Sequence, residues 1–126
     1  MREERGKVIG NQVISEPMDL WGSITGNVTV VKGGKMYVRG AIVGHLVVED
    51  GGRVHVYGNV SGNLSVAQGA KVILSGIVGG DAANNGGRLY VDNLGKVNGK
   101  LIKNGGDTVV DPKAQVPRQE DLKAKA

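Results

Sequence analysis

The sequence predicts an all-β protein, a three-sided parallel β-helix of about five turns with about 18 residues in each turn. Three observations predict this fold: an 18-residue repeat, alternation of apolar residues within each repeat, and glycines that recur at fixed positions. The 126 residues suffice for one domain, but only 3% of them are aromatic and none is phenylalanine. A sandwich or helical bundle of this length would lack the large side chains that fill a thick core. A narrow, valine-lined interior suits this composition.

The repeat begins at residue 22 and continues without a gap for three units. These units are GSITGNVTVVKGGKMYVR (22–39), GAIVGHLVVEDGGRVHVY (40–57) and GNVSGNLSVAQGAKVILS (58–75). A fourth copy covers residues 76–94, with one residue lost and two gained, and a shortened fifth copy covers residues 95–110. A unit this short cannot enclose its own core, so successive units are expected to stack.

Apolar residues within each unit occupy positions 3, 7, 9, 15 and 17, as Ile42, Leu46, Val48, Val54 and Val56 do. This alternation is typical of strands, in which every second side chain faces the same way. Three short strands separated by corners then form one turn, and turns stacked about 4.8 Å apart bring residues 18 apart in sequence into contact. Because the hexad spacing of left-handed β-helices is absent, we predict a right-handed coil.

Glycine recurs where the chain is expected to turn a corner. Gly33, Gly51 and Gly69 share one position of the repeat, and further glycines occupy the first and fifth positions. A tight corner requires either a positive φ or a close backbone approach, and glycine permits both. The position after Gly69 holds Ala70, so that column is not expected to need a left-handed conformation.

The ends of the chain do not follow the repeat closely. Residues 1–17 are expected to form an N-terminal tail that partly caps the first turn, with Pro17 at the entry to a repeat domain spanning 18–110. Residues 111–126 contain two prolines and seven charged residues, which predicts a flexible C-terminal tail. The N-terminus has no apolar run that would serve as a secretory signal or membrane span, so we expect a cytoplasmic protein.

The outward positions of the repeat predict a partner-binding face. Position 14 is basic in four successive units, while positions 16 and 18 hold all four aromatic residues of the chain. Exposed aromatic and arginine side chains are favoured anchors of binding surfaces, although aromatic residues also stack across strands for structural reasons alone. The predicted face comprises Trp21, Tyr37, Arg39, His55, Tyr57, Tyr90, Lys35, Arg53, Lys71 and Arg88.

The charge of the repeat region indicates which partner this face would suit. Residues 22–110 contain nine basic and five acidic residues. An acidic protein is the expected partner, because the basic ladder has no recognised nucleic-acid-binding motif beside it. We expect no enzymatic activity, cofactor or metal: the chain has no cysteine, and His45 and His55 occupy positions on different sides of the predicted rod.

Several segments carry a resemblance to the bactofilins, a family of bacterial cytoskeletal proteins. These segments are GSITGNV (22–28), GNVSGNL (58–64) and VILSGIVGGD (72–81), and the similarity covers about residues 18–110. The resemblance implies a right-handed three-sided β-helix that stacks end to end into nucleotide-independent filaments, often at the membrane, and scaffolds other proteins. Free strand edges at the ends of a β-helix are consistent with such stacking unless the tails cap them.

Two functions are therefore expected. The first is a non-enzymatic scaffold that associates with itself end to end, with membrane association left open. The second is a cytoplasmic binding or inhibitor protein, similar to an immunity or adaptor protein, that holds an acidic partner through the predicted face.

Overall fold

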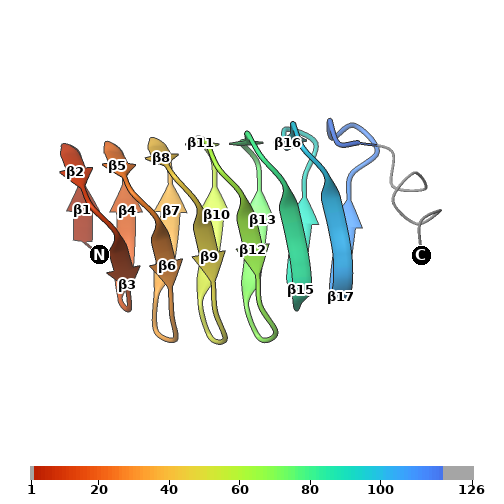
Figure 1. The fold of residues 1–126 in the computed structure, drawn as a ribbon, viewed down its shortest axis with the longest axis horizontal. Helices are drawn as coiled ribbons and strands as arrows, with labels where there is room; N and C mark the ends of the chain where they lie inside the picture. Colours follow the sequence, from red (N-terminus) through yellow and green to blue (C-terminus); the bar gives the residue numbers. More distant parts are fainter. Residues whose placement is uncertain (1, 118–126) are drawn as a thin grey trace.

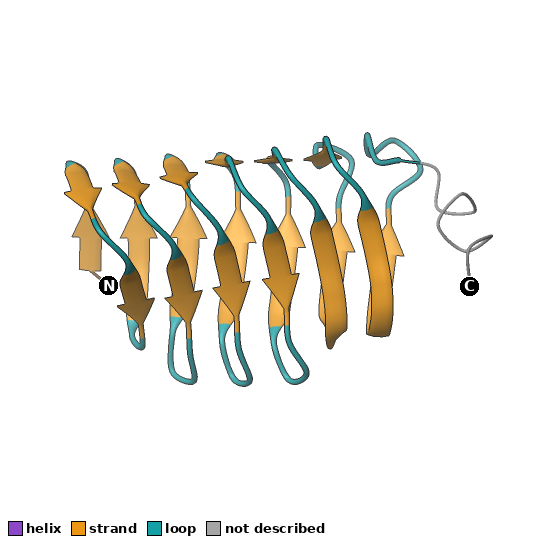
Figure 2. Cartoon of the chain, viewed as in Figure 1, coloured by secondary structure: helices purple, strands orange, loops and turns teal. Residues whose placement is uncertain are grey.

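The computed structural model describes residues 2–117, and within that range the chain consists only of strands and the turns between them (Figures 1 and 2). Successive turns lie side by side along the long axis, with β1 at one end and β17 at the other (Figure 1). All strand pairs are parallel and connect neighbouring turns. The protein is therefore a β-solenoid of about 6 turns, which confirms the predicted fold class.

The strands form three faces, which we name A, B and C. Face A contains β1 (Arg2–Glu4), β4 (Pro17–Leu20), β7 (Lys35–Val38), β10 (Arg53–Val56) and β13 (Lys71–Leu74). Face B contains β3 (Gln12–Ile14), β6 (Val28–Val30), β9 (Leu46–Val48) and β12 (Leu64–Val66). Face C contains β2 (Lys7–Ile9), β5 (Ser23–Thr25), β8 (Ala41–Val43), β11 (Asn59–Val60), β14 (Ile77–Val78) and β16 (Lys96–Val97). The longer strands β15 (Ala82–Val91) and β17 (Leu101–Val110) continue from face B into face A.

The register of the strands produces the predicted columns. Val54 lies opposite Met36 on one side and Val72 on the other, each 18 residues away. Inward positions are buried from β4 to β15: Ile42 and Leu46 are 0% exposed, for example. Burying one such side chain contributes about 1.5–3 kcal/mol, so stability accumulates with each added turn.

The N-terminal segment forms a complete turn, which extends the solenoid beyond the boundary expected at residue 18. Strands β1, β2 and β3 pair in parallel with β4, β5 and β6. This turn is two residues shorter than the repeat, because the corner at 15–16 replaces the four residues at 31–34. Glu4 and Gln12 occupy positions that hold Leu20 and Val28 in the next turn. The first turn thus has polar groups at its outer end, as expected of a capping repeat.

The first part of the predicted C-terminal tail is attached to the solenoid. Gln115 forms a parallel bridge with Lys96, and Val97 N–H donates to the carbonyl oxygen of Gln115 at 2.9 Å. Ala114 and Val116 pack against the core. The rest of that predicted tail, from residue 118 onward, lies outside the described residues.

Two glycine columns show why the corners require this residue. Gly33, Gly51 and Gly69 have φ angles of 89°, 82° and 83°, in the left-handed region. The first-position glycines instead allow close stacking, because a Cβ on Gly58 would collide with the carbonyl oxygen of Gly40 in the preceding turn.

Candidate binding face

The structure brings the ten predicted residues to one side of the rod. Lys35, Arg53, Lys71 and Arg88 lie directly opposite one another on β7, β10, β13 and β15. The adjacent column on the same strands contains Tyr37, His55, Ile73 and Tyr90. Trp21, Arg39 and Tyr57 follow the ends of β4, β7 and β10, where face A meets face C.

Arg39 lies at the centre of an aromatic cluster and is engaged within the protein. Its guanidinium carbon is 4.9 Å from the Trp21 ring centroid and 4.8 Å from that of Tyr57. Arg39 Nε also donates to Asp19 Oδ1 at 2.7 Å. Cation–π contacts of this kind contribute about 0.5–1 kcal/mol each at exposed sites. Arg39 therefore holds neighbouring turns together. It was predicted only as a contact for a partner, and this structural role was not expected.

His55 extends this cluster into a polar chain. Its ring stacks on Tyr57, with centroids 3.9 Å apart and 16° between the planes, and its Nε2 lies 2.8 Å from Ser75 Oγ. Ser75 donates its hydroxyl hydrogen to Asp92, so its oxygen accepts from His55 Nε2–H. Burial lowers the pKa of His55 below 6.5, which the Asp92 charge opposes and the Arg39 charge reinforces. This chain of hydrogen bonds was not predicted from the sequence, although Ser75 and Asp92 occupy the same position of the repeat as Trp21, Arg39 and Tyr57.

Within residues 2–117, the four cations of position 14, which we call the cation column, form no ion pair. All four side chains are exposed, and the ion pairs found within residues 2–117 are Arg2–Glu16, Arg5–Glu3 and Arg39–Asp19. Like charges directly opposite each other on adjacent strands are destabilising. The cation column is thus a strip of positive potential that ends at β17, where Asp107 lies opposite Arg88.

A groove runs beside the C-terminal half of the cation column. Its volume is about 660 Å³, and its lining includes Lys71, Arg88, Asp107, Ile73, Tyr90 and Val109. Tyr90 is 39% exposed and Val109 is 57% exposed. Val109, which was not among the predicted residues, lies opposite Tyr90 on β17 and forms an apolar column with Tyr90 and Ile73. Face A therefore carries two parallel rows at this end, one cationic and one apolar.

A ladder of polar side chains occupies the corner between faces C and B. Asn27 N–H donates to Asn11 Oδ1 at 2.9 Å, and Asn63 N–H donates to His45 Nδ1 at 2.9 Å, each linking one turn to the next. His45 therefore carries its proton on Nε2. The sequence analysis did not identify this ladder, although asparagine recurs at position 6 of the repeat.

The arrangement defines the class of the protein: a β-solenoid repeat protein with one aromatic and cationic face. Within residues 2–117 there is no group of three or more histidine, aspartate or glutamate side chains placed to hold a metal ion. The described chain also contains no helix long and apolar enough to span a bilayer. Comparison with protein-family models, curated proteins and solved structures gives no match for this chain.

Proposed function

We propose that this protein is a non-enzymatic structural scaffold that associates end to end into filaments, as the resemblance to bactofilins implies. The observation that carries this proposal is the strand edge at each end of the rod. In residues 2–117, β1, β2 and β3 each pair with a strand on one side only, and β17 pairs only with β15. The free N–H and C=O groups of such an edge are a template for another chain.

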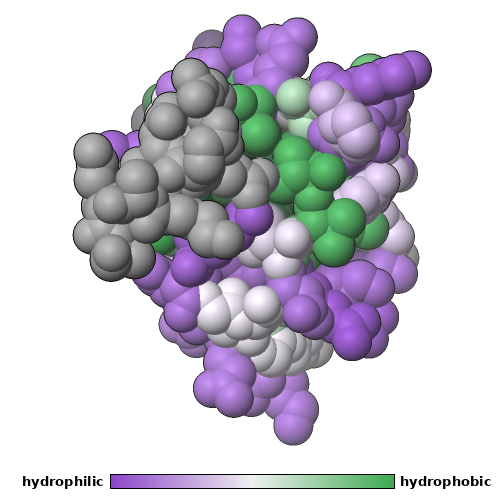
Figure 3. All heavy atoms as spheres, turned by 90° about the vertical axis from the view of Figure 1, so that its right-hand side faces the viewer, coloured by the Kyte–Doolittle hydropathy of each residue, from purple (hydrophilic) through white to green (hydrophobic). Residues whose placement is uncertain are grey.

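The alignment of the three faces along the rod supports stacking of one copy on another. The parallel register keeps the three faces aligned from the first turn to the last, so a second copy could continue the same ladder. Hydrophobic side chains gather on the end that carries β17, surrounded by hydrophilic residues (Figure 3). Val110 and Val116 are only partly buried there and pack against the core.

Gly6 provides a direct test of end-to-end contact. It begins the glycine column in which a Cβ on Gly22 or Gly40 would collide with the carbonyl oxygen of the preceding turn. A Cβ on Gly6 would meet only Glu4 Oε2, at 3.9 Å, because no turn precedes it. Alanine at this position should therefore fit the isolated rod but collide with a neighbouring copy stacked on that end.

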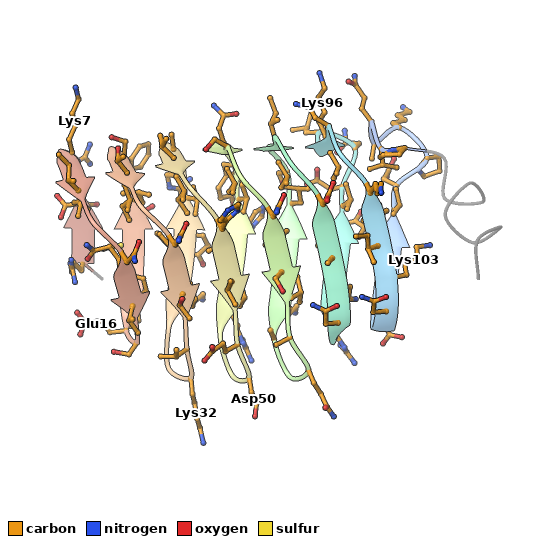
Figure 4. All side chains as sticks on the ribbon, viewed as in Figure 1. Lys7, Glu16, Lys32, Asp50, Lys96 and Lys103 are labelled. Carbon is orange, nitrogen blue, oxygen red and sulfur yellow. The ribbon has the colours of Figure 1, made fainter. Side chains whose placement is uncertain are left out.

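The experiment compares wild-type protein, Gly6→Ala and Lys32→Ala, a control substitution on the side of the rod, by sedimentation velocity and negative-stain electron microscopy. Lys32 projects from the corner between faces B and A, away from both ends (Figure 4). We expect fibres from the wild-type protein and from Lys32→Ala, and folded, non-polymerising Gly6→Ala with an unchanged Tm. Wild-type protein that stays monodisperse at high concentration, or fibres from Gly6→Ala, would contradict the proposal.

The cation column favours a second candidate function, a binding or inhibitor protein for an acidic partner. This function uses the side of the rod rather than its ends. Charge reversal at Lys71 and Arg88 should abolish capture of the partner and leave the fold intact, whereas Gly6→Ala should leave capture unchanged. Capture that survives the charge reversal would exclude this candidate.

A further inference from the structure

We infer that the C-terminal half of face A is a docking site for an acidic amphipathic α-helix of a partner protein. The helix would lie along the rod, with carboxylates on Lys71 and Arg88, none facing Asp107 of β17, and an apolar row in the neighbouring groove. The inference rests on the second candidate function and specifies the shape of the partner.

The spacing of the cation column selects a helix over an extended peptide. Adjacent strands are about 4.8 Å apart, so the three intervals from Lys35 to Arg88 span about 14 Å. Three turns of an α-helix advance about 16 Å, a difference that flexible lysine and arginine side chains can absorb. In an extended strand, side chains on one side repeat about every 6.7 Å, so three intervals cover about 20 Å and lose register with the column.

The apolar column supplies the second row that an amphipathic helix requires. Ile73, Tyr90 and Val109 follow one another on β13, β15 and β17 and line the groove next to Lys71 and Arg88. Residues three and four apart form one face of a helix, so an apolar row can run beside an acidic row. The proposed helix would thus contact both columns at the same time.

The N-terminal half of face A is less suited to receive a ligand. Arg39 is held between Trp21 and Tyr57, and His55 is stacked on Tyr57. Single-stranded nucleic acid binds through cations together with aromatic rings that stack on bases. Tyr90 has no aromatic or cation–π contact within residues 2–117, whereas the other three aromatic side chains are engaged in the cluster. A helix that needs one apolar row therefore fits better than a series of stacked bases.

The test uses synthetic peptides with a fluorescent label and measures Kd by fluorescence anisotropy. The helical probe has about 18 residues, or five turns, with glutamate once per turn, leucine in the adjacent row and a covalent staple. One control peptide replaces each glutamate with glutamine, another has the same acidic and apolar residues interrupted by prolines, and oligo(dT) represents nucleic acid. The protein variants are Lys71→Glu with Arg88→Glu, and the matched control Lys96→Glu with Lys100→Glu, which changes the net charge equally on exposed residues outside face A.

We expect the helical acidic peptide to bind the wild-type protein and the control variant equally. Single neutralisation, Lys71→Gln or Arg88→Gln, should weaken binding about two- to fivefold, as loss of one exposed ion pair predicts. The double reversal should weaken binding more than tenfold, and raising the salt concentration from about 0.1 M to about 1 M should weaken it strongly because the Debye length falls from about 10 Å to about 3 Å. Each variant should keep the wild-type Tm.

Each contrary result identifies what has failed. Equal binding of the proline-interrupted peptide would overturn the helix while leaving the acidic-partner function intact. Equal loss of binding in the control variant would show non-specific charge attraction and overturn the site. Preference for oligo(dT) would assign the face to nucleic acid, and binding of no acidic peptide would remove both the inference and the function on which it rests.

Discussion

Asn84 offers the sharpest test of the structural reasoning, because the repeat and the structure make opposite predictions for it. Asn84 is 0% exposed and lies opposite Val66 in an inward column that holds valine in the three preceding turns. The column alone predicts that Asn84→Val would stabilise the protein. The structure predicts that it destabilises the protein, because the Asn84 side chain holds together the shortened corner of β15.

The hydrogen bonds of Asn84 determine the expected magnitude. Oδ1 accepts from Gly86 N–H at 3.1 Å and Gly87 N–H at 2.8 Å, while Nδ2 donates to the carbonyl oxygens of Gly87 and Asp107 and to Thr108 Oγ1. A buried donor or acceptor without a partner costs about 1–3 kcal/mol. Burial of the valine side chain stabilises the folded protein by about 1.5–3 kcal/mol. Since several groups lose their partner at once, we expect a net loss of about 1–3 kcal/mol, or about 3–12 °C in Tm.

Urea and thermal unfolding monitored by circular dichroism would measure this loss, and hydrogen exchange at the Gly86 and Gly87 amides would localise it. Asn84→Asp is an isosteric second variant. Its carboxylate keeps an acceptor for the two glycine amides but directs a second acceptor at two carbonyl oxygens, so it should cost more than Asn84→Val at neutral pH. An Asn84→Val protein as stable as the wild type would refute the assignment of this side chain as the support of the corner.

Three further predictions concern the ladder, the glycine column and His55. His45→Ala should destabilise the protein by about 0.5–1.5 kcal/mol in urea unfolding, because Asn63 N–H loses its acceptor, whereas His45→Asn should retain the wild-type stability because an amide oxygen replaces Nδ1; equal stability of the two variants would count against the ladder. Gly58→Ala should prevent folding or cost more than about 3 kcal/mol, whereas Gly6→Ala should change stability by less than about 1 kcal/mol, and similar Tm values for the two variants would contradict the stacking geometry. Because the pKa of His55 is lowered in the native state, its stabilising contribution is complete above pH 6.5 and is lost as the pH falls from there towards the native pKa. His55→Gln should therefore make Tm less sensitive to acidification across this range, and parallel Tm profiles for the two proteins would argue against the shift.

The repeated part of the fold could be predicted because its information is local and recurs. Apolar residues at alternate positions, repeated every 18 residues, are sufficient to place Val48, Val56, Val66 and Leu74 in the interior, and each is 0% exposed. The same 18-residue period also predicts which side of the rod carries the aromatic and basic residues. Prediction works here because one periodicity determines both the direction of each side chain and its neighbours in space.

The features that escaped prediction are those where the repeat is interrupted. The first turn was predicted only as a tail that partly caps the solenoid, because Glu4 and Gln12 replace apolar residues and the corner at 15–16 lacks the glycine pair. The engagement of Arg39 depends on side-chain conformations that bring two rings to its guanidinium, and column positions do not specify these. Asn84 replaces the valine of its column because the next corner is one residue shorter. That corner leaves the N–H and C=O groups of Gly87 to be paired by a polar side chain.

The three edges of the rod differ in how strictly they fix the length of the chain. The edge with the asparagine ladder keeps the same spacing between the paired inward residues of faces C and B in successive turns, as in Ile24 and Val28, Ile42 and Leu46, and Val60 and Leu64. The edge between faces B and A has two residues at 15–16, four at 31–34 and none at β15 and β17, which cross it without a break. The edge between faces A and C varies from two residues at 57–58 to four at 92–95. Loops inserted at these two variable edges should therefore leave the pitch of the rod unchanged, so epitopes or enzymes could be displayed there at regular intervals.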